Sequence, residues 1–304
     1  MNSDSLIGKK TALVMRSRII QAVRDFFIDR GFLEIETPVR IPVPALELHI
    51  DAVPSGDYFL RTSPELHMKR LLAAGYERIF QIGPCFRHGE KGRLHNPEFT
   101  MLEWYRLNAD YNSILLDAKM LMAFLAEKIL GDCSIIYQGK KIELMPLWEC
   151  IQVDDAFLLN AGWSPVKHYD ADRFDMDLIE KVEPNLPSDR PVVLMDYPAE
   201  AAALARRKPG RQEVAERWEL YIGGMELVNA FSELTDPLEQ RRRFEECAAE
   251  RRRADRPVYA LDEKFLASLE KGMSASGGAA LGLDRLVMLF ADTTEIEQVR
   301  SFCP

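Results

Sequence analysis

Hydrophobic side chains recur at two different spacings along the chain, and the spacing changes between helix-like and strand-like several times. In residues 11–30 the apolar positions lie three or four apart, which predicts an amphipathic helix that ends at Gly31. Residues 32–39 predict a short strand that ends at Pro38. Residues 39–58 are rich in proline, and this composition predicts a loop with little regular structure.

The helical spacing returns further along the chain. A helix is predicted at residues 63–75, with Ser63 as the N-cap and Pro64 in the first turn. Residues 77–87 predict a strand, and residues 113–130 predict another amphipathic helix. Helices and strands therefore alternate through the first half of the chain.

The second half of the chain contains more strands. Residues 131–190 mix short apolar runs with Asp and Pro and predict a helical insertion, and residues 191–198 predict a buried strand. Strands at 217–222 and 225–234 are separated by two glycines, which predicts a hairpin with a two-residue turn. A charged helix is predicted at 237–253. Strands joined by hairpins favour an α+β fold, a mainly antiparallel sheet flanked by helices.

Composition narrows the class of protein. The chain has 304 residues, 47% of them hydrophobic, and no repeat or linker divides it, so we predict a single domain over residues 1–304. It contains no long apolar run and no signal-peptide pattern, so we expect a soluble cytoplasmic protein that has no contact with a membrane. The five scattered cysteines argue against a disulfide framework or a zinc site, and the net charge of -9 argues against a broad nucleic-acid surface.

One carboxylate has an unexpected position on the strand predicted for residues 99–106. Successive side chains point to opposite faces, so Leu102 and Trp104 form a core face, and Glu103 and Tyr105 lie on the other face. A half-buried carboxylate costs on the order of several kcal/mol unless a cation or hydrogen-bond donors meet it. The pattern leaves two interpretations open: a cation or hydrogen-bond donors meet Glu103, or the strand faces solvent and the acid is incidental.

The predicted hairpin brings two more carboxylates together. In its simplest register Tyr221 faces Glu226 and Glu219 faces Val228. Glu219 and Glu226 then become diagonal neighbours on one face, about 7–8 Å apart at the backbone. Magnesium prefers a few carboxylates together with phosphate oxygens and water. The pair predicts a metal–phosphate site, and the alternative is two solvated surface acids.

Two other stretches combine charges in ways that a ligand could use. Asn229 and Glu233 lie on one face of the run NAFSEL, where an amide and an acid could bind the two ends of an amino acid. The loop CFRHGEKGRLHNPEF crowds basic side chains between glycines, with Arg87 placed as a bidentate clamp for an oxyanion. The alternatives are an ordinary polar strand face and a basic surface loop.

Arginines near the C-terminal end offer two further candidates. Arg285 falls in the first turn of a predicted helix, where a cation opposes the helix dipole, so it indicates a ligand. The alternative is a surface salt bridge to Asp284 or Glu295. The arginine-rich run 241–256 predicts either a solvated helix or a patch that docks an acidic partner.

Together these segments resemble the catalytic domain of the class II aminoacyl-tRNA synthetases of the lysyl type. FRHGEKGRLHNPEFTMLEWY resembles motif 2, GLDRLVM resembles motif 3, and the helix and strand that end at Pro38 resemble motif 1, the dimerisation element. TSPELHMKRL, DYP and ELVNAFSEL are further lysyl-type signatures in the expected order. The resemblance spans nearly the whole chain and implies a homodimer that uses ATP and Mg²⁺.

The resemblance also implies a role for each candidate residue. It implies that ATP is bound by Arg87, Glu90, His95, Phe99, Glu219 and Arg285. Among these residues, Arg87 and Arg285 would be the catalytic charges. It implies magnesium binding by Glu219 and Glu226. It implies binding of a lysine-like amino acid by Glu65, Glu103, Tyr105, Asn229, Glu233 and Ala280. Within that set, Glu103, Tyr105 and Glu233 would enclose the distal ammonium, which answers why a strand face carries an acid.

Two departures from the lysyl synthetases are informative. Those enzymes carry an anticodon-binding OB-fold ahead of this domain, whereas motif 1 here begins almost at Met1, so we do not expect an anticodon-binding domain or tRNA charging. The glycine series before motif 3 reads Gly278, Ala280, Gly282, and one methyl group can shift amino-acid preference by ~1–3 kcal/mol. Both features match the short paralogues that ligate (R)-β-lysine to a lysine of translation elongation factor P.

A third departure lies in motif 2, where Gly89 replaces an acid and Glu90 is adjacent. Either Glu90 takes the place of that acid, or one contact to ATP is lost.

The activity that the resemblance implies is adenylation of (R)-β-lysine or lysine, followed by transfer to a lysine side chain of elongation factor P. The alternatives are a truncated lysyl-tRNA synthetase and a non-catalytic amino-acid-binding paralogue.

Overall fold

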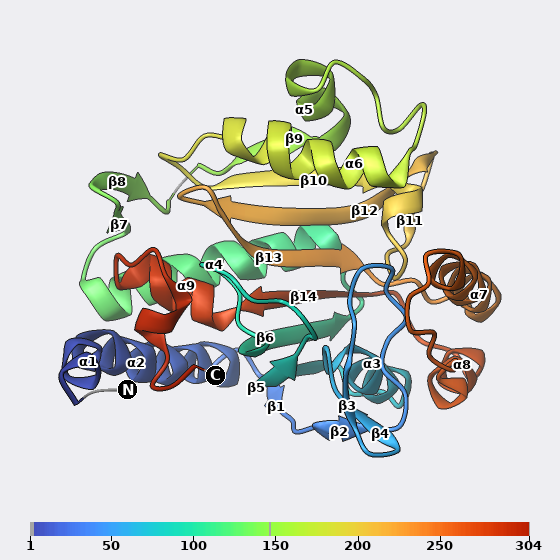
Figure 1. The fold of residues 1–304 in the computed structure, drawn as a ribbon, viewed down its shortest axis with the longest axis horizontal. Helices are drawn as coiled ribbons and strands as arrows, with labels where there is room; N and C mark the ends of the chain where they lie inside the picture. The colour runs from blue at the N-terminus through green and yellow to red at the C-terminus, as the bar shows by residue number, and fades with distance from the viewer. Residues whose placement is uncertain (1–2, 146, 304) are drawn as a thin grey trace.

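A nine-stranded sheet forms the centre of the computed structural model, which describes residues 3–145 and 147–303 (Figure 1). Its strands are β1 (Leu33–Glu34), β5 (Arg78–Phe86), β6 (Glu98–Leu107), β9 (Glu149–Gln152), β10 (Val192–Pro198), β11 (Arg207–Lys208), β12 (Arg211–Ile222), β13 (Met225–Ser232) and β14 (Ser276–Gly282). The strand order is β1-β5-β6-β14-β13-β12-β10-β9, and β11 pairs with β12. The pairs β1–β5 and β9–β10 are parallel, and the pairs between them are antiparallel. The predicted α+β fold around a mainly antiparallel sheet is confirmed.

Helices flank this sheet. They are α1 (Ser3–Gly8), α2 (Lys10–Ile28), α3 (Glu65–Ala73), α4 (Tyr111–Leu130), α5 (Val153–Asn160), α6 (Ala171–Asp177), α7 (Pro237–Arg253), α8 (Glu263–Glu270) and α9 (Leu283–Phe290). The helices predicted from the chain at residues 11–30, 63–75, 113–130 and 237–253 are confirmed as α2, α3, α4 and α7. No described helix is long and apolar enough to cross a membrane.

The main core lies between the sheet and helices α2, α4 and α9. Leu102 and Trp104 of β6 are fully buried in it beside Phe27 of α2 and Leu121 of α4, which confirms the core face predicted for this strand. Figure 1 shows α4 behind the central strands and the loop between β5 and β6 in front of them. Since alternate side chains of a strand point to opposite faces, Glu103 faces away from these helices.

The loop predicted for residues 39–58 needs correction. Residues 39–58 contain β2 (Arg40–Ile41) and β3 (Val53–Ser55), which pair with β4 (Tyr58–Leu60) in a small three-stranded sheet. These strands are too short to show alternation in the sequence, and their pairing is decided by the fold around them.

The helical insertion expected at residues 131–190 is mixed rather than helical. It contains α5 and α6, but also the hairpin of β7 (Ser134–Tyr137) with β8 (Lys140–Glu143). It also contains β9, which pairs with β10 at one edge of the central sheet. Partners that lie more than 40 positions away in the chain leave no local pattern that could predict such an edge strand.

Candidate active site

Four neighbouring strands place one row of side chains on the sheet face away from the helical core. Glu103 of β6 lies opposite Ala280 of β14, Ala280 lies opposite Asn229 of β13, and Asn229 lies opposite Glu219 of β12. Residues directly opposite in a sheet point to the same face, so this register brings together residues far apart in the chain. The next row consists of Tyr105, Gly278, Phe231 and Arg217.

A β-bulge in the hairpin corrects the predicted register. Tyr221 faces Glu226 as predicted, but Glu219 faces Asn229 rather than Val228, because Leu227 is an extra residue in β13. Without the bulge, alternation would turn Asn229 away from Glu219. With the bulge, both Glu226 and Asn229 reach the same side as Glu219. A single inserted residue therefore joins the predicted metal pair to the predicted amino-acid contact.

A cavity of about 310 Å³ lies over these strands. Side chains predicted for ATP, magnesium and the amino acid line it together: Arg87, Glu90, His95, Phe99, Glu219, Glu226, Asn229, Ala280 and Arg285. Asn96, Thr100 and Asp284 also contribute to its wall. Segments that are separated by nearly 200 positions in the chain thus converge on one space.

The loop between β5 and β6 supplies the first charged group of this cavity. Arg87 lies 5.1 Å from the ring of Phe99, and its Nη1 is 3.7 Å from Oε1 of Glu90. Gly89 has a φ of 78°, a left-handed conformation that favours glycine. The residue after this turn, Glu90, has its carboxylate beside Arg87 and lines the cavity. Of the two interpretations of the altered motif 2, this geometry favours replacement of the missing acid by Glu90.

Arg285 enters the cavity from the first turn of α9. It donates from Nη1 to Oε2 of Glu226 at 3.0 Å, and its Nη2 lies 2.6 Å from Nε2 of His95. Burial and the charge of Arg285 lower the pKa of His95, so its ring is suited to accept this hydrogen bond. The alternative partners of Arg285 proposed from the sequence, Asp284 and Glu295, are therefore wrong.

The predicted ammonium site lies deeper in the sheet. Glu103 and Glu233 are each 1% exposed, and Glu103 accepts hydrogen bonds from Tyr105 Oη and Ser63 Oγ, both at 2.7 Å. Burial raises the pKa of Glu103 to about 7 and that of Glu233 to about 8. A Cβ at Gly278 would overlap the Tyr105 ring and lie 2.6 Å from Oε1 of Glu233, so the absence of a side chain there permits this packing. A carboxylate buried in this way is costly in its charged form unless a cation or hydrogen-bond donors meet it.

Lys69 of α3 is a charged residue that sequence reasoning missed. It is fully buried, its Nζ lies 2.6 Å from Oε1 of Glu65, and it forms a second ion pair with Glu233. Burial lowers the pKa of Lys69, but Glu233 and Glu65 outweigh this effect, and the pKa is raised. Its spacing from Glu65 on a helix, four positions, was the available signal. Two of the three predicted acids are therefore already paired, and Glu103 remains without a cationic partner among the described residues.

Neither the 310 Å³ cavity nor the larger cavity that adjoins it is lined by Glu103, Tyr105 or Glu233. Glu103 lies in the same row as Ala280 and Asn229, at the end away from Glu219, and Tyr105 lies in the next row. The expectation that all of them surround an open pocket is thus only partly met, because Lys69 occupies the space between Glu65 and Glu233. A ligand ammonium would have to approach Glu103 past Ala280.

Arg217 is a second functional candidate missed from the sequence. Its guanidinium donates to Oε1 of Glu219 at 2.6 Å, to Oδ1 of Asn229 at 3.1 Å and to the carbonyl of Ala201 at 2.7 Å. The other oxygen of Glu219 accepts from Tyr197 at 2.6 Å and from the hydroxyl of Tyr221. The spacing of Arg217 and Glu219, two positions on one strand, could have predicted that they share a face.

Carboxylates on the cavity wall suit magnesium. Glu219 and Glu226 both line the cavity. Burial and the nearby charges of these two residues raise the pKa of Glu183 to about 7, although a hydrogen bond from Tyr221 acts to lower it. No group of three or more His, Cys, Asp or Glu in the described residues is arranged to hold a metal by itself. Two hard oxygen donors that need phosphate oxygens to complete the coordination fit Mg²⁺.

A family model described as tRNA synthetases class II (D, K and N) matches residues 8–304. The chain belongs to this family. An "Elongation factor P--(R)-beta-lysine ligase" of Haemophilus influenzae is similar to this class II synthetase at 41% identity, over 95% of the chain and 94% of that protein.

Longer relatives are similar as well. A "Lysine--tRNA ligase" of Moorella thermoacetica is 37% identical over 96% of the chain and 65% of that protein. One of Coxiella burnetii is 36% identical over 94% of the chain and 63% of that protein. This class II synthetase therefore spans a little under two thirds of the length of these lysine–tRNA ligases, whereas it matches the Haemophilus protein nearly end to end.

Proposed function

We propose that this class II synthetase is an ATP-dependent ligase in the cytoplasm that activates (R)-β-lysine or lysine and transfers it to a lysine side chain of elongation factor P. The observation that carries this proposal is the correspondence over 94% of the length of a relative with that name. The row that joins Glu103, Ala280, Asn229 and Glu219 supports it, because it combines a buried acid for an ammonium with an amide for a carboxylate.

The proposed reaction has two steps, formation of an aminoacyl-adenylate and transfer of the amino acid to the acceptor. A carboxylate oxygen of the amino acid attacks the α-phosphorus of ATP, the bond to the β-phosphate oxygen breaks, and pyrophosphate leaves with the electron pair. Arg87 holds the α-phosphate and the carboxylate, His95 and Arg285 hold the outer phosphates, and Phe99 stacks on adenine. Positioned charges of this kind stabilise the developing negative charge without a covalent intermediate on the protein.

Magnesium, held by Glu219 and Glu226, would neutralise phosphate charge when bound. In the second step the acceptor amine attacks the carbonyl carbon of the adenylate. The bond from that carbon to the AMP oxygen breaks, AMP leaves with the electron pair, and the amine nitrogen releases its proton as the amide forms. Asn229 orients the carboxylate, and Glu65 meets the amino group nearer the backbone end of the substrate.

Purified protein given ATP, Mg²⁺ and either lysine isomer tests the proposal. We expect amino-acid-dependent exchange of pyrophosphate into ATP and a mass increase of elongation factor P by one lysyl unit. Absence of exchange with either isomer would contradict it, and binding of the amino acid without exchange would favour a non-catalytic binder. Charging of tRNA without modification of elongation factor P would favour a lysine–tRNA ligase.

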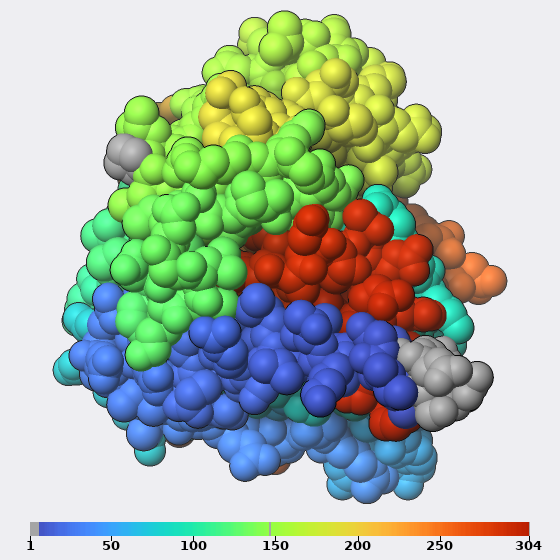
Figure 2. Space-filling model, turned by 90° about the vertical axis from the view of Figure 1, so that its left-hand side faces the viewer, coloured from blue at the N-terminus to red at the C-terminus, as the bar shows by residue number. Residues whose placement is uncertain are grey.

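We also propose a homodimer through motif 1. Figure 2 shows the side of the molecule along which α1 and α2 run. Apolar side chains from this region are strongly exposed in the single chain: Ile7 (69%), Val14 (52%), Ile28 (55%) and Leu33 (50%). Apolar residues exposed together are typical of an interface. Sedimentation equilibrium should give twice the chain mass, and replacement of Val14 and Ile28 by Glu should give the monomer.

A further inference from the structure

A second cavity of about 680 Å³ adjoins the first. Both are lined by the same five residues, so the two spaces are continuous: Glu47, Ile50, Arg217, Glu219 and Asn229. From there the second cavity extends between α6, the loop at residues 199–205 and α7. Glu65, Glu219 and Asn229, which are assigned to the amino acid and to magnesium, line its near end, whereas the part between α6, the loop at residues 199–205 and α7 has no residue assigned to ATP or the amino acid.

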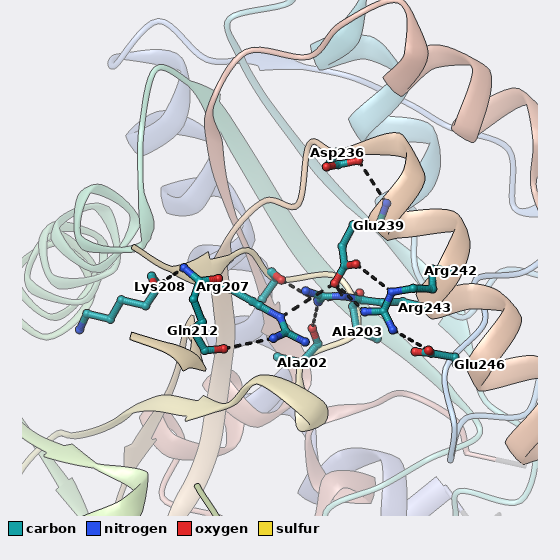
Figure 3. A network of polar contacts seen from close by, with 11 residues as sticks. Ala202, Ala203, Arg207, Lys208, Gln212, Asp236, Glu239, Arg242, Arg243 and Glu246 are labelled. Carbon is teal, nitrogen blue, oxygen red and sulfur yellow. Dashed lines mark hydrogen bonds and ion pairs between the residues drawn. The ribbon is translucent and has the colours of Figure 1, made fainter. Parts of the chain in front are cut away.

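One wall of the second cavity is fixed by a network of polar contacts on α7 (Figure 3). Arg243, which is 8% exposed, donates to the carbonyls of Ala202 at 2.6 Å and Ala205 at 2.9 Å. Glu239 accepts from Arg243 at 2.9 Å and from Arg242 at 2.8 Å. These bonds tie the helix to the alanine-rich loop. They also show that the arginines of the run 241–256 are largely paired rather than displayed as a basic patch.

The loop at residues 47–50 forms the opposite boundary and is held as firmly. Fully buried Arg251 donates from Nη1 to the carbonyls of Glu47 at 2.6 Å and Ile50 at 3.0 Å. Nε2 of His49 lies 2.9 Å from Oδ2 of Asp175 on α6. The second cavity is therefore a preformed groove, because hydrogen bonds to the backbone fix both of its sides.

The groove is lined by more acidic than basic side chains. Its carboxylates are Glu47, Glu65, Asp175, Glu200, Glu219, Glu246 and Glu250, and its arginines are Arg207, Arg217, Arg242 and Arg243. The four arginines and five of the seven carboxylates form ion pairs, and among the described residues the remaining two carboxylates, Glu47 and Glu200, make no ion pair or side-chain hydrogen bond. This lining attracts a cation and repels a phosphate backbone.

We propose that this groove admits the acceptor protein, with its lysine side chain extended past Glu200 towards Glu47 and the adenylate. The inference rests on the proposed function. Glu47 stands where the two cavities meet, so its carboxylate would receive the acceptor ammonium, which releases one proton to solvent before the neutral amine attacks. A lysine on an exposed loop has the charge and the slender stem that such a groove fits. The aromatic side chains of Tyr169 and Phe174 supply apolar surface for that stem.

Charge reversal at the groove tests this proposal. Glu200→Lys and Glu250→Lys place a cation on either wall at exposed positions, and Glu245→Lys makes the same change on an exposed part of α7 that does not line a described cavity. We expect kcat/KM for modification of the acceptor protein to fall about tenfold in each groove variant. The variants should retain pyrophosphate exchange and the formation of lysyl hydroxamate with hydroxylamine, a small nucleophile that needs no docking. Glu245→Lys should match the unsubstituted enzyme.

Each outcome decides a separate point. Equal acceptor modification by the groove variants and Glu245→Lys would overturn the inference and leave the proposed function intact. A loss of exchange in parallel with the loss of modification would also overturn it, because the groove would then serve activation instead of docking. An unsubstituted enzyme that forms no adenylate overturns the proposed function, and the inference with it. Raised salt should slow the unsubstituted enzyme more than Glu200→Lys if attraction of a cation is the cause.

Discussion

The candidate site has an inner end, at Glu103 and Glu233, and an outer end, at Arg87 and Arg285. The charged side chains of the inner end are fully buried, whereas those of the outer end are partly exposed. At the inner end, Glu103 and Glu233 are buried carboxylates with raised pKa values, and Lys69 is the one lysine paired with the acids there in the described structure. At the outer end, the side chains of Arg87 and Arg285 keep 25% and 18% of their surface exposed. Buried acids are costly until a cation arrives, whereas exposed arginines stay hydrated and accommodate a mobile polyphosphate.

This difference separates selection from chemistry. A desolvated acid distinguishes strongly between a ligand with an ammonium and one without, because the acid is left unpaired by the wrong ligand. Hydrated arginines bind many phosphates with similar strength but can stabilise charge that develops on them. Substitutions at the inner end should therefore change amino-acid binding, and substitutions at the outer end should change the rate of activation.

The largest effect is expected for Glu103→Gln. The amide keeps the shape, and its single oxygen can accept from one of the two hydroxyls of Ser63 and Tyr105 while its NH2 group donates to the other, but it cannot neutralise an ammonium, so KM for the amino acid in pyrophosphate exchange should rise about 10³-fold. KM for ATP should change little. Glu245→Gln, on the exposed surface of α7, is the matched control. An unchanged amino-acid KM would show that the ammonium binds elsewhere.

Arg285→Ala should lower kcat for pyrophosphate exchange about 10²-fold, in the range for loss of one group that stabilises the transition state. It also releases Glu226 and His95 from their contacts with Arg285. KM for the amino acid should stay near its original value, since Arg285 lies at the outer end. A rise in that KM with unchanged kcat would instead place Arg285 in amino-acid binding.

Stability should reveal the cost of the buried acid at the inner end. Burial raises the pKa of Glu103 from its ordinary 4.5 to about 7, so the folded state holds this proton after the unfolded chain has released it. This contribution to the free energy of unfolding is zero well below pH 4.5, falls as pH rises towards 7, and is a full penalty above that. Glu103→Gln should therefore be more stable than the unsubstituted protein at pH 8 by about 3 kcal/mol, and equal to it at pH 4.

Urea unfolding at the two pH values measures this difference. Saturating lysine should reverse the order at pH 8, because only the unsubstituted protein gains the ammonium contact. If the two proteins were equally stable at pH 8 without ligand, the carboxylate of Glu103 would already be neutralised by its surroundings.

The smallest effect is expected for Ala280→Gly. The methyl group of Ala280 lies on the cavity wall between Glu103 and Asn229, so its removal widens the amino-acid pocket. We expect the ratio of kcat/KM for α-lysine over (R)-β-lysine to rise about tenfold, as one carbon in a pocket typically allows. Ala279→Gly changes the neighbouring residue on the core face and should leave the ratio unaltered. A ratio unchanged by Ala280→Gly would show that selection between the isomers lies elsewhere.

Local sequence was enough to predict much of the fold and most of the cavity wall. The spacing of apolar residues predicted α2 and α4, and the two glycines predicted the hairpin of β12 and β13, because these features depend on neighbours a few positions away. Alternation along β6 separated Glu103 from Trp104. The family resemblance identified the segments that resemble motif 2 and motif 3, and residues of both segments line one cavity.

Tertiary structure decided what lies between those elements. The bulge at Leu227 turns Asn229 towards Glu219, and Lys69 inserts between Glu65 and Glu233. The groove that meets the cavity at Glu47 is enclosed by four segments of the chain: residues 47–50, α6, residues 199–205 and α7. Periodicity specifies which face of an element a side chain occupies, but the register between strands and the cation that reaches a buried acid depend on packing across the whole chain.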